Sequence, residues 1–164
     1  MGKFLMPRAV LWGGLICGTL DLTAACIDVG VNYGQSPVWL LQNVAGALLG
    51  PDSYQCGWPS AGLGLLMHFS VAFTVTAIFY RLSRRFPLLR RWAVPSGLVY
   101  GAGVFLVMYR LVIPLTIALK SLYLTQPFTH NWPQLRWSQL FVHFICIGLP
   151  IALIVRRYST PPEN

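Results

Sequence analysis

Charged residues are scarce in this sequence, and acidic residues are nearly absent. Of 164 residues only 10% are charged and only 4 are Asp or Glu, whereas 55% are apolar. The mean hydropathy is +0.60, and a typical soluble domain carries about 25% charged residues. The shortage of charge therefore argues against a water-soluble protein, and the length predicts a single domain over residues 1–164.

Motifs that carry known chemistry are also missing. The sequence contains no CxxCH, HExxH, phosphate-binding loop or Ser–His–Asp spacing. We therefore assign no catalytic residue, and no motif argues for an enzyme.

Basic residues, by contrast, gather in three short stretches. Lys3 and Arg8 precede the first apolar run, five arginines lie in 81–91, and Arg156 and Arg157 follow the last run. A net charge of +8 suggests nucleic acid at first sight, but this placement marks one side of a membrane. We expect the lipid bilayer, and not nucleic acid, as the partner of this chain.

Four apolar stretches are long enough, or nearly so, to cross a bilayer of about 30 Å, which takes about 20 helical residues. They cover residues 9–29, 61–80, 95–118 and 137–155. An even number of spans puts both termini on one side, and the positive-inside rule makes that side the cytoplasm. The sequence thus predicts an all-α, multi-pass four-helix bundle with both termini cytoplasmic.

The connection between the first two spans contains one further helix. The segment PVWLLQNVAGALLG, residues 37–50, begins with Pro and ends with Gly, which is typical of a short helix. Its length suits an interfacial or re-entrant segment, or a surface helix that covers the bundle. Asn43 would then face polar surroundings at the mouth of any site inside the bundle.

The first span carries an acid, Asp21. A cleaved lipoprotein signal ending before Cys26 is one explanation, but Asp21 interrupts the apolar region that such a signal needs. A carboxylate within a membrane costs about 2.5–3.5 kcal/mol on insertion scales and normally faces the protein interior. Asp21 shares a helical face with Gly14, Gly18 and Asp28, so we expect this face to point into the bundle.

Two other spans place a histidine at the level of Asp21. His68 lies in the second span, and His143 shares a face of the fourth span with Gln139. Each of the three polar residues lies 13 positions from an arginine at the inner end of its span, namely Arg8, Arg81 and Arg156. Each is therefore roughly 20 Å from the cytoplasmic boundary. This coincidence predicts a buried polar cluster of Asp21, His68 and His143.

Several roles suit such a cluster. An Asp–His pair provides a proton acceptor near neutral pH, which favours a site or path for a proton or a small solute. Two facing imidazoles, His68 and His143, suit a haem iron or, together with Asp21, a divalent metal in a redox protein. The third alternative is that both histidines only hydrogen-bond backbone or hydroxyl groups in a packed bundle.

Arg110 is a second charge within a span. Either its long side chain reaches outward to the interface, or it is the counter-charge of Asp21 or Asp28 across the bundle. Pro114 follows shortly after and is expected to kink the outer end of this span.

Two cysteines, Cys26 and Cys56, fall at or beyond the outer boundary of the membrane. An oxidising compartment there would allow a disulfide between them. Such a bond would stabilise the fold by roughly 3–4 kcal/mol through loop closure. Two free thiols are the alternative.

Glycines at helical spacing in the first and third spans let helices approach closely. They serve either packing within the bundle or contact with a second copy or another membrane subunit. The sequence leaves these alternatives open, and with them the possibility of an accessory role in a membrane complex.

A set of short motifs in a fixed order also carries a family resemblance. The motifs are GTLDL, PVWLLQNVAGALLG, GLGLLMHFSVAF, RRFPLLRR and GLVYGAGVFLVM followed by VIPLT. The chain from Gly13 to Pro114 resembles a group of small four-span bacterial inner-membrane proteins, and more distantly the YagU-like proteins. The resemblance implies a four-helix fold in a bacterial inner membrane and supplies no catalytic residue. Tyr109-Arg110 departs from the group, in which an uncharged residue is expected after the methionine.

Overall fold

The computed structural model describes residues 5–123 and 136–159, and within these ranges it contains helices and no strand. Four helical stretches there are long and apolar enough to cross a membrane: Arg8–Tyr33, Gly57–Arg85, Ala93–Ala118 and Trp137–Tyr158. The predicted all-α fold with four apolar helices is therefore confirmed. Each helix extends beyond its predicted range at one end or both.

Two of the four spans are unbroken α-helices, and two contain a π-helical turn. The first span is α1 (Leu5–Tyr33) and the second is α3 (Gly57–Arg85). The third consists of α5 (Ala93–Val107), the π segment η2 (Met108–Val112) and α6 (Ile113–Tyr123). The fourth consists of α7 (Trp137–Val142), the π segment η3 (His143–Gly148) and α8 (Leu149–Ser159). The connections hold α2 (Pro37–Leu49), the 3-10 turn η1 (Gly50–Tyr54) and α4 (Leu88–Arg91).

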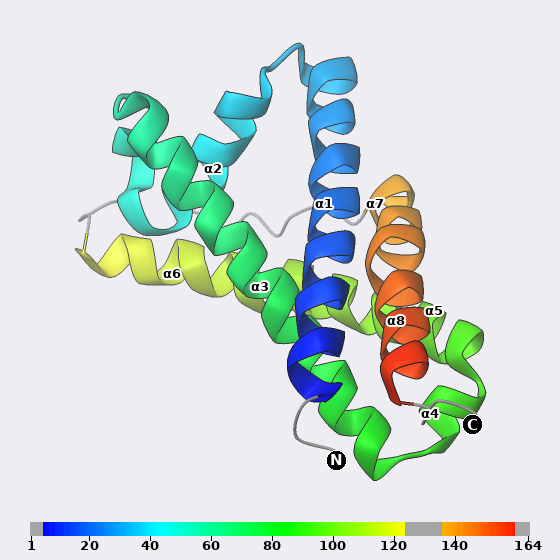
Figure 1. Ribbon diagram of the computed structural model, residues 1–164. Coiled ribbons are helices and arrows are strands. Elements are labelled where there is room, and N and C mark those ends of the chain that lie inside the picture. The colour runs from blue at the N-terminus through cyan, green and yellow to red at the C-terminus, as the bar shows by residue number, and fades with distance from the viewer. Residues whose placement is uncertain (1–4, 124–135, 160–164) are drawn as a thin grey trace.

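Figure 1 shows how the helices are arranged. Helix α1 runs alongside the fourth span, α7 to α8, while α3 crosses α1 obliquely. The third span passes across the bundle, so that α5 contacts α8 and η3 whereas α6 reaches α2. The beginning of α1 and the end of α8 lie at the same end of the molecule.

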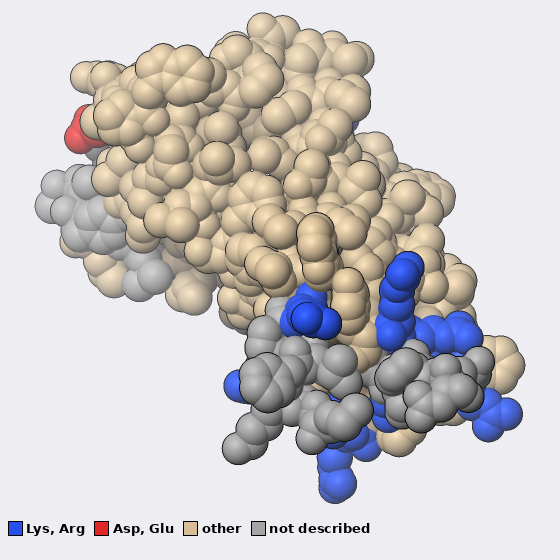
Figure 2. Space-filling view, viewed as in Figure 1, with Lys and Arg blue, Asp and Glu red and all other residues tan. Residues whose placement is uncertain are grey.

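Basic side chains mark that same end. In Figure 2 the Lys and Arg side chains gather over the start of α1, α4 and the end of α8, and most of the remaining surface in view is uncharged. Arg81, Arg84 and Arg85 lie at the end of α3, Arg90 and Arg91 on α4, and Arg156 and Arg157 on α8. Arg8 and the arginines of the other two basic stretches therefore lie at one end of the fold.

The outer surface of the spans is apolar. Leu66 is 65% exposed, Val99 is 73% exposed and Phe141 is 62% exposed. No more than 33% of the most apolar window of any span is buried. Contact between apolar side chains and water is unfavourable, so this surface is suited to the hydrocarbon of a bilayer.

Glycines allow the third and fourth spans to touch through their backbones. A Cβ on Gly101 would lie 2.5 Å from the carbonyl oxygen of His143, and a Cβ on Gly97 would lie 2.7 Å from that of Gly148. Small residues at a helix interface permit this approach within a membrane. The glycine face of the third span thus serves packing inside the bundle.

The glycine face of α1 packs differently. Gly14 and Gly18 lie against the rings of Phe73 and Phe69 on α3 rather than against a helix backbone. The aromatic rings fill the groove that the glycines leave, and this contact fixes the side of α1 on which Asp21 lies.

The predicted helix at 37–50 is present as α2. Ser36 caps its start, because its Oγ accepts a hydrogen bond from the Trp39 N–H at 3.1 Å. Gly50 ends it with a φ of 66°, a value that glycine adopts readily. The helix lies directly on α3, because a Cβ on Gly64 would collide with the Leu41 carbonyl oxygen.

Both π segments end two residues before a proline, Pro114 after η2 and Pro150 after η3. Proline lacks the N–H that the preceding turn needs, and its ring clashes with the carbonyl four residues earlier. A π turn relieves this clash by widening the helix. The kink expected at Pro114 therefore takes the form of a π turn, and the fourth span contains a second one.

Candidate functional site

A cavity of about 470 Å³ lies between the four spans and α2. Asp21 from α1, His68 from α3 and His143 from η3 all line it. Asn43 from α2 lines it as well and is exposed. The structure thus brings together the three residues of the predicted polar cluster and one of the secondary candidates.

Asp21 is the one carboxylate among the described residues that line this cavity. It is half-buried, and no hydrogen bond or ion pair joins it to another described residue. It lies close enough to both imidazoles to interact with them electrostatically. A carboxylate within a span is costly unless it is paired, so we expect Asp21 to bind a group from outside the chain.

His68 is anchored to α1. Its Nε2 lies 2.9 Å from the carbonyl oxygen of Gly18. Because a carbonyl only accepts, Nε2 carries the proton, and in the neutral ring Nδ1 is left as an acceptor. Phe69 supports the ring from the side, with the centroids 5.4 Å apart.

His143 is anchored within its own span, through the other ring nitrogen. Its Nδ1 lies 2.8 Å from the carbonyl oxygen of Gln139, so Nδ1 is the donor and Nε2 is left as the acceptor. The rings of Phe105 and Tyr109 meet it edge-on at 5.3 and 6.4 Å between centroids. Both histidines are thus held in defined tautomers, each with one nitrogen able to accept a hydrogen bond.

The side chain of Asn43 is held by a residue that does not line the cavity. The Tyr54 hydroxyl donates to its Oδ1 at 2.9 Å. Burial raises the pKa of the Tyr54 phenol, so this group keeps its proton and its role as a donor. The NH₂ group of Asn43 is left as a donor.

Most of the cavity wall is apolar. Valine, isoleucine and methionine side chains come from α3, α5, η2, α6 and η3, and they include Val75, Val104, Met108, Ile117 and Ile147. Pockets of a few hundred Å³ with mostly apolar walls and a few convergent polar groups are typical of small-molecule sites.

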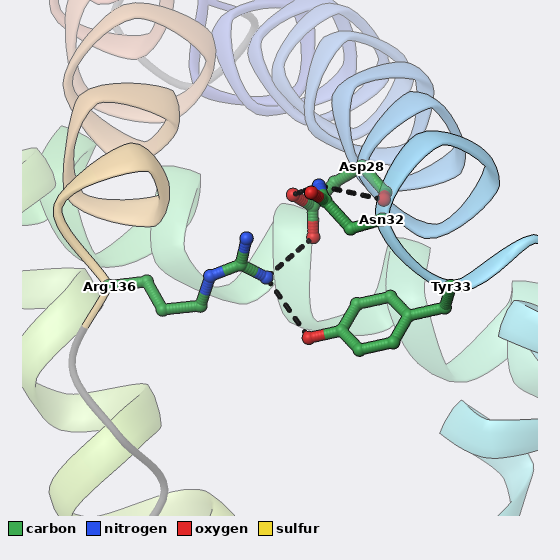
Figure 3. A network of polar contacts seen from close by, with 4 residues as sticks. All are labelled: Asp28, Asn32, Tyr33 and Arg136. Atoms are coloured by element: carbon green, nitrogen blue, oxygen red, sulfur yellow. Dashed lines mark hydrogen bonds and ion pairs between the residues drawn. The ribbon is translucent and has the colours of Figure 1, made fainter.

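Asp28 lies near the C-terminal end of α1 and belongs to a polar network that is separate from the cavity (Figure 3). Its Oδ2 lies 3.2 Å from Nη1 of Arg136, which also donates to the Tyr33 hydroxyl at 3.1 Å. The Asn32 side chain donates to Asp28 Oδ1 at 2.8 Å. This network ties the end of α1 to the start of α7.

The structure pairs Asp28 with Arg136. The two alternatives for Arg110, a side chain that reaches outward or a counter-charge of Asp21 or Asp28, stay predictions. Arg110 lies on η2 and is exposed. Arg136 is the residue just before α7, where it reaches the end of α1 directly. Sequence separation concealed this contact, since the two partners are 108 positions apart.

The other secondary candidates lie outside the cavity lining. Gln139 contributes its backbone carbonyl, which holds His143, and not its side chain. Cys26 is half-buried and Cys56 is exposed, and both are free thiols in the structure, so the predicted disulfide is not formed there.

The predicted metal site finds no support in the geometry. Within 5–123 and 136–159 no three side chains of His, Cys, Asp or Glu are placed so that they could hold one ion. Asp21, His68 and His143 therefore line one space without forming a three-ligand centre.

Several residues that line the cavity were not among the site residues predicted from the sequence. Gly18 contributes its carbonyl oxygen. Met108, which precedes Pro114 in the third span, and Thr116, which follows it, also line the cavity. Pro114 was the available signal, because a proline in a helix displaces the residues around it.

No family model, curated protein or solved structure matches this chain. We therefore infer its function from the cavity.

Proposed function

We propose that this chain is a multi-pass protein of a bacterial inner membrane that binds a small solute in its intramembrane cavity. Binding there would serve either to pass the solute, or a proton, across the membrane or to present it to a partner subunit. The carboxylate of Asp21 carries the proposal, since it lines the cavity without a partner among the described side chains.

The distribution of charge supports the proposed orientation. The start of α1, α4 and the end of α8 form one basic end (Figure 2), and cytoplasmic segments of membrane proteins carry such an excess of Lys and Arg. The resemblance to small four-span inner-membrane proteins supports the same location.

A cavity-filling variant tests the binding role. We expect the purified protein in nanodiscs to bind aminoanthracene, a neutral apolar fluorophore, with increased emission. Val112 lines the cavity, so Val112→Phe should remove this signal. Val99→Phe is the matched control, because Val99 is 73% exposed on the same span and faces outward. Equal fluorescence from both variants and the wild type would contradict a ligand-binding cavity.

A further inference from the structure

The polar groups of the cavity are mostly acceptors. Asp21 offers two carboxylate oxygens, His68 leaves Nδ1 and His143 leaves Nε2 once their donors have been satisfied by Gly18 and Gln139. A ligand that matches them must supply several donors from one small group.

The charge of the lining selects among such ligands. No Lys or Arg belongs to the described residues that line the cavity, and Asp21 is the acid there. An anion would meet this carboxylate with no cation to compensate it, and a cation would neutralise it at low dielectric. The lining therefore favours a positively charged group.

The lining also distinguishes between kinds of cation. No Phe, Tyr or Trp is among the described lining residues, so a quaternary ammonium would find no ring face to bind and has no N–H to donate. A primary ammonium carries three N–H donors. These can be shared among one carboxylate and two imidazole nitrogens.

We propose that the cavity binds a primary alkylammonium ion, with its ammonium group at Asp21, His68 and His143 and its alkyl chain along the apolar wall. That wall is formed by side chains such as Val75, Val104, Met108, Ile117 and Ile147. This assignment names the ligand class of the proposed solute-binding function and rests on it.

A series of eight-carbon ligands tests the assignment on the unmodified protein. Octylammonium, octyltrimethylammonium, octanol and octanoate share the chain and differ only in the head group. In equilibrium dialysis against the protein in nanodiscs, corrected with empty nanodiscs, we expect octylammonium to bind at least tenfold more tightly than the other three. Equal affinity for octanol or octyltrimethylammonium, or no binding of octylammonium, would overturn the assignment.

Variants add a second test. Asp21→Asn should weaken octylammonium binding at least tenfold, whereas Asp52→Asn should leave it unchanged, because Asp52 is exposed on η1 and does not line the cavity. Unchanged binding by Asp21→Asn would overturn the assignment.

The aminoanthracene measurement separates the two proposals. If aminoanthracene binds and Val112→Phe abolishes its binding while octylammonium shows no preference, the cavity binds solutes of another class. If neither ligand binds, both proposals are wrong.

Discussion

The two cavity histidines are held in opposite tautomers by two different helices. His68 donates from Nε2 to Gly18 on α1, and His143 donates from Nδ1 to Gln139 one turn earlier in its own span. Backbone carbonyls do not titrate, so these contacts orient the rings without supplying a charge. The charge of the site comes from Asp21, which makes this residue the one whose replacement should change ligand choice.

Asp28 and Arg136 provide a test of the network in Figure 3. The pair is half-buried, with side-chain exposures of 19% for Asp28 and 36% for Arg136. We expect a double-mutant cycle of Asp28→Asn and Arg136→Gln to give a coupling free energy of about 0.5–1 kcal/mol, the upper range of surface pairs. Thermal unfolding in detergent measures it.

Asp52→Asn combined with Arg136→Gln is the control for this cycle and should show additive effects. Additive effects for the Asp28 pair as well would mean that the contact does not stabilise the fold.

At the scale of elements, the packing of the third span against the fourth depends on particular glycines. A Cβ on Gly101 would lie 2.5 Å from the backbone of His143, whereas a Cβ on Gly103 meets nothing within 4 Å. We expect Gly101→Ala to destabilise the protein by about 1–3 kcal/mol through overpacking. Gly103→Ala should be neutral or stabilise it, since alanine favours a helix by about 0.5–1 kcal/mol over glycine.

Unfolding of both variants in the same detergent measures the difference. A destabilisation of similar size at both positions would indicate that the loss comes from helix propensity or lipid contact and not from the helix interface.

The number of spans and their approximate positions were predictable because they follow from local properties. Apolar length located the four spans, and Pro37 and Gly50 located α2. The π turns were not foreseen, because a proline signals a disturbance without specifying how the helix absorbs it. The face predicted for the fourth span assumed a regular helix, and in the structure Ile147 rather than Gln139 joins His143 in the cavity lining.

At the scale of the whole molecule, the charge asymmetry predicts which side faces the cytoplasm. Cys56 lies before α3, at the end of that helix away from the basic end, and is exposed. In a background with the other cysteines replaced by alanine, a membrane-impermeant maleimide should label Cys56 from outside the inner membrane. Leu88→Cys in a cysteine-free background should be labelled only after permeabilisation, because Leu88 is 63% exposed on α4 at the basic end.

The reverse pattern of labelling would show the opposite orientation. Labelling of both positions from one side would contradict an arrangement in which α3 crosses the membrane between them.

The meeting of Asp21, His68 and His143 could be anticipated because equal spacing from basic anchors gives equal depth in a membrane. Depth alone does not specify the direction in which each side chain points, however. The side of α1 that faces the cavity depends on how this helix packs against Phe69 and Phe73. The contact of Asp28 with Arg136 depends on the tertiary arrangement of α1 and α7, which no local pattern encodes.

The π turn η2 has a consequence for the angular phase of the third span. A π turn contains about one residue more than the α-helical turn it replaces, and each α-helical residue corresponds to a rotation of about 100°. The side chains of α6 are therefore out of phase with those of α5. One continuous span can in this way present its glycine face to the fourth span through Gly97 and Gly101 and turn Ile113, Thr116 and Ile117 toward the cavity and α2.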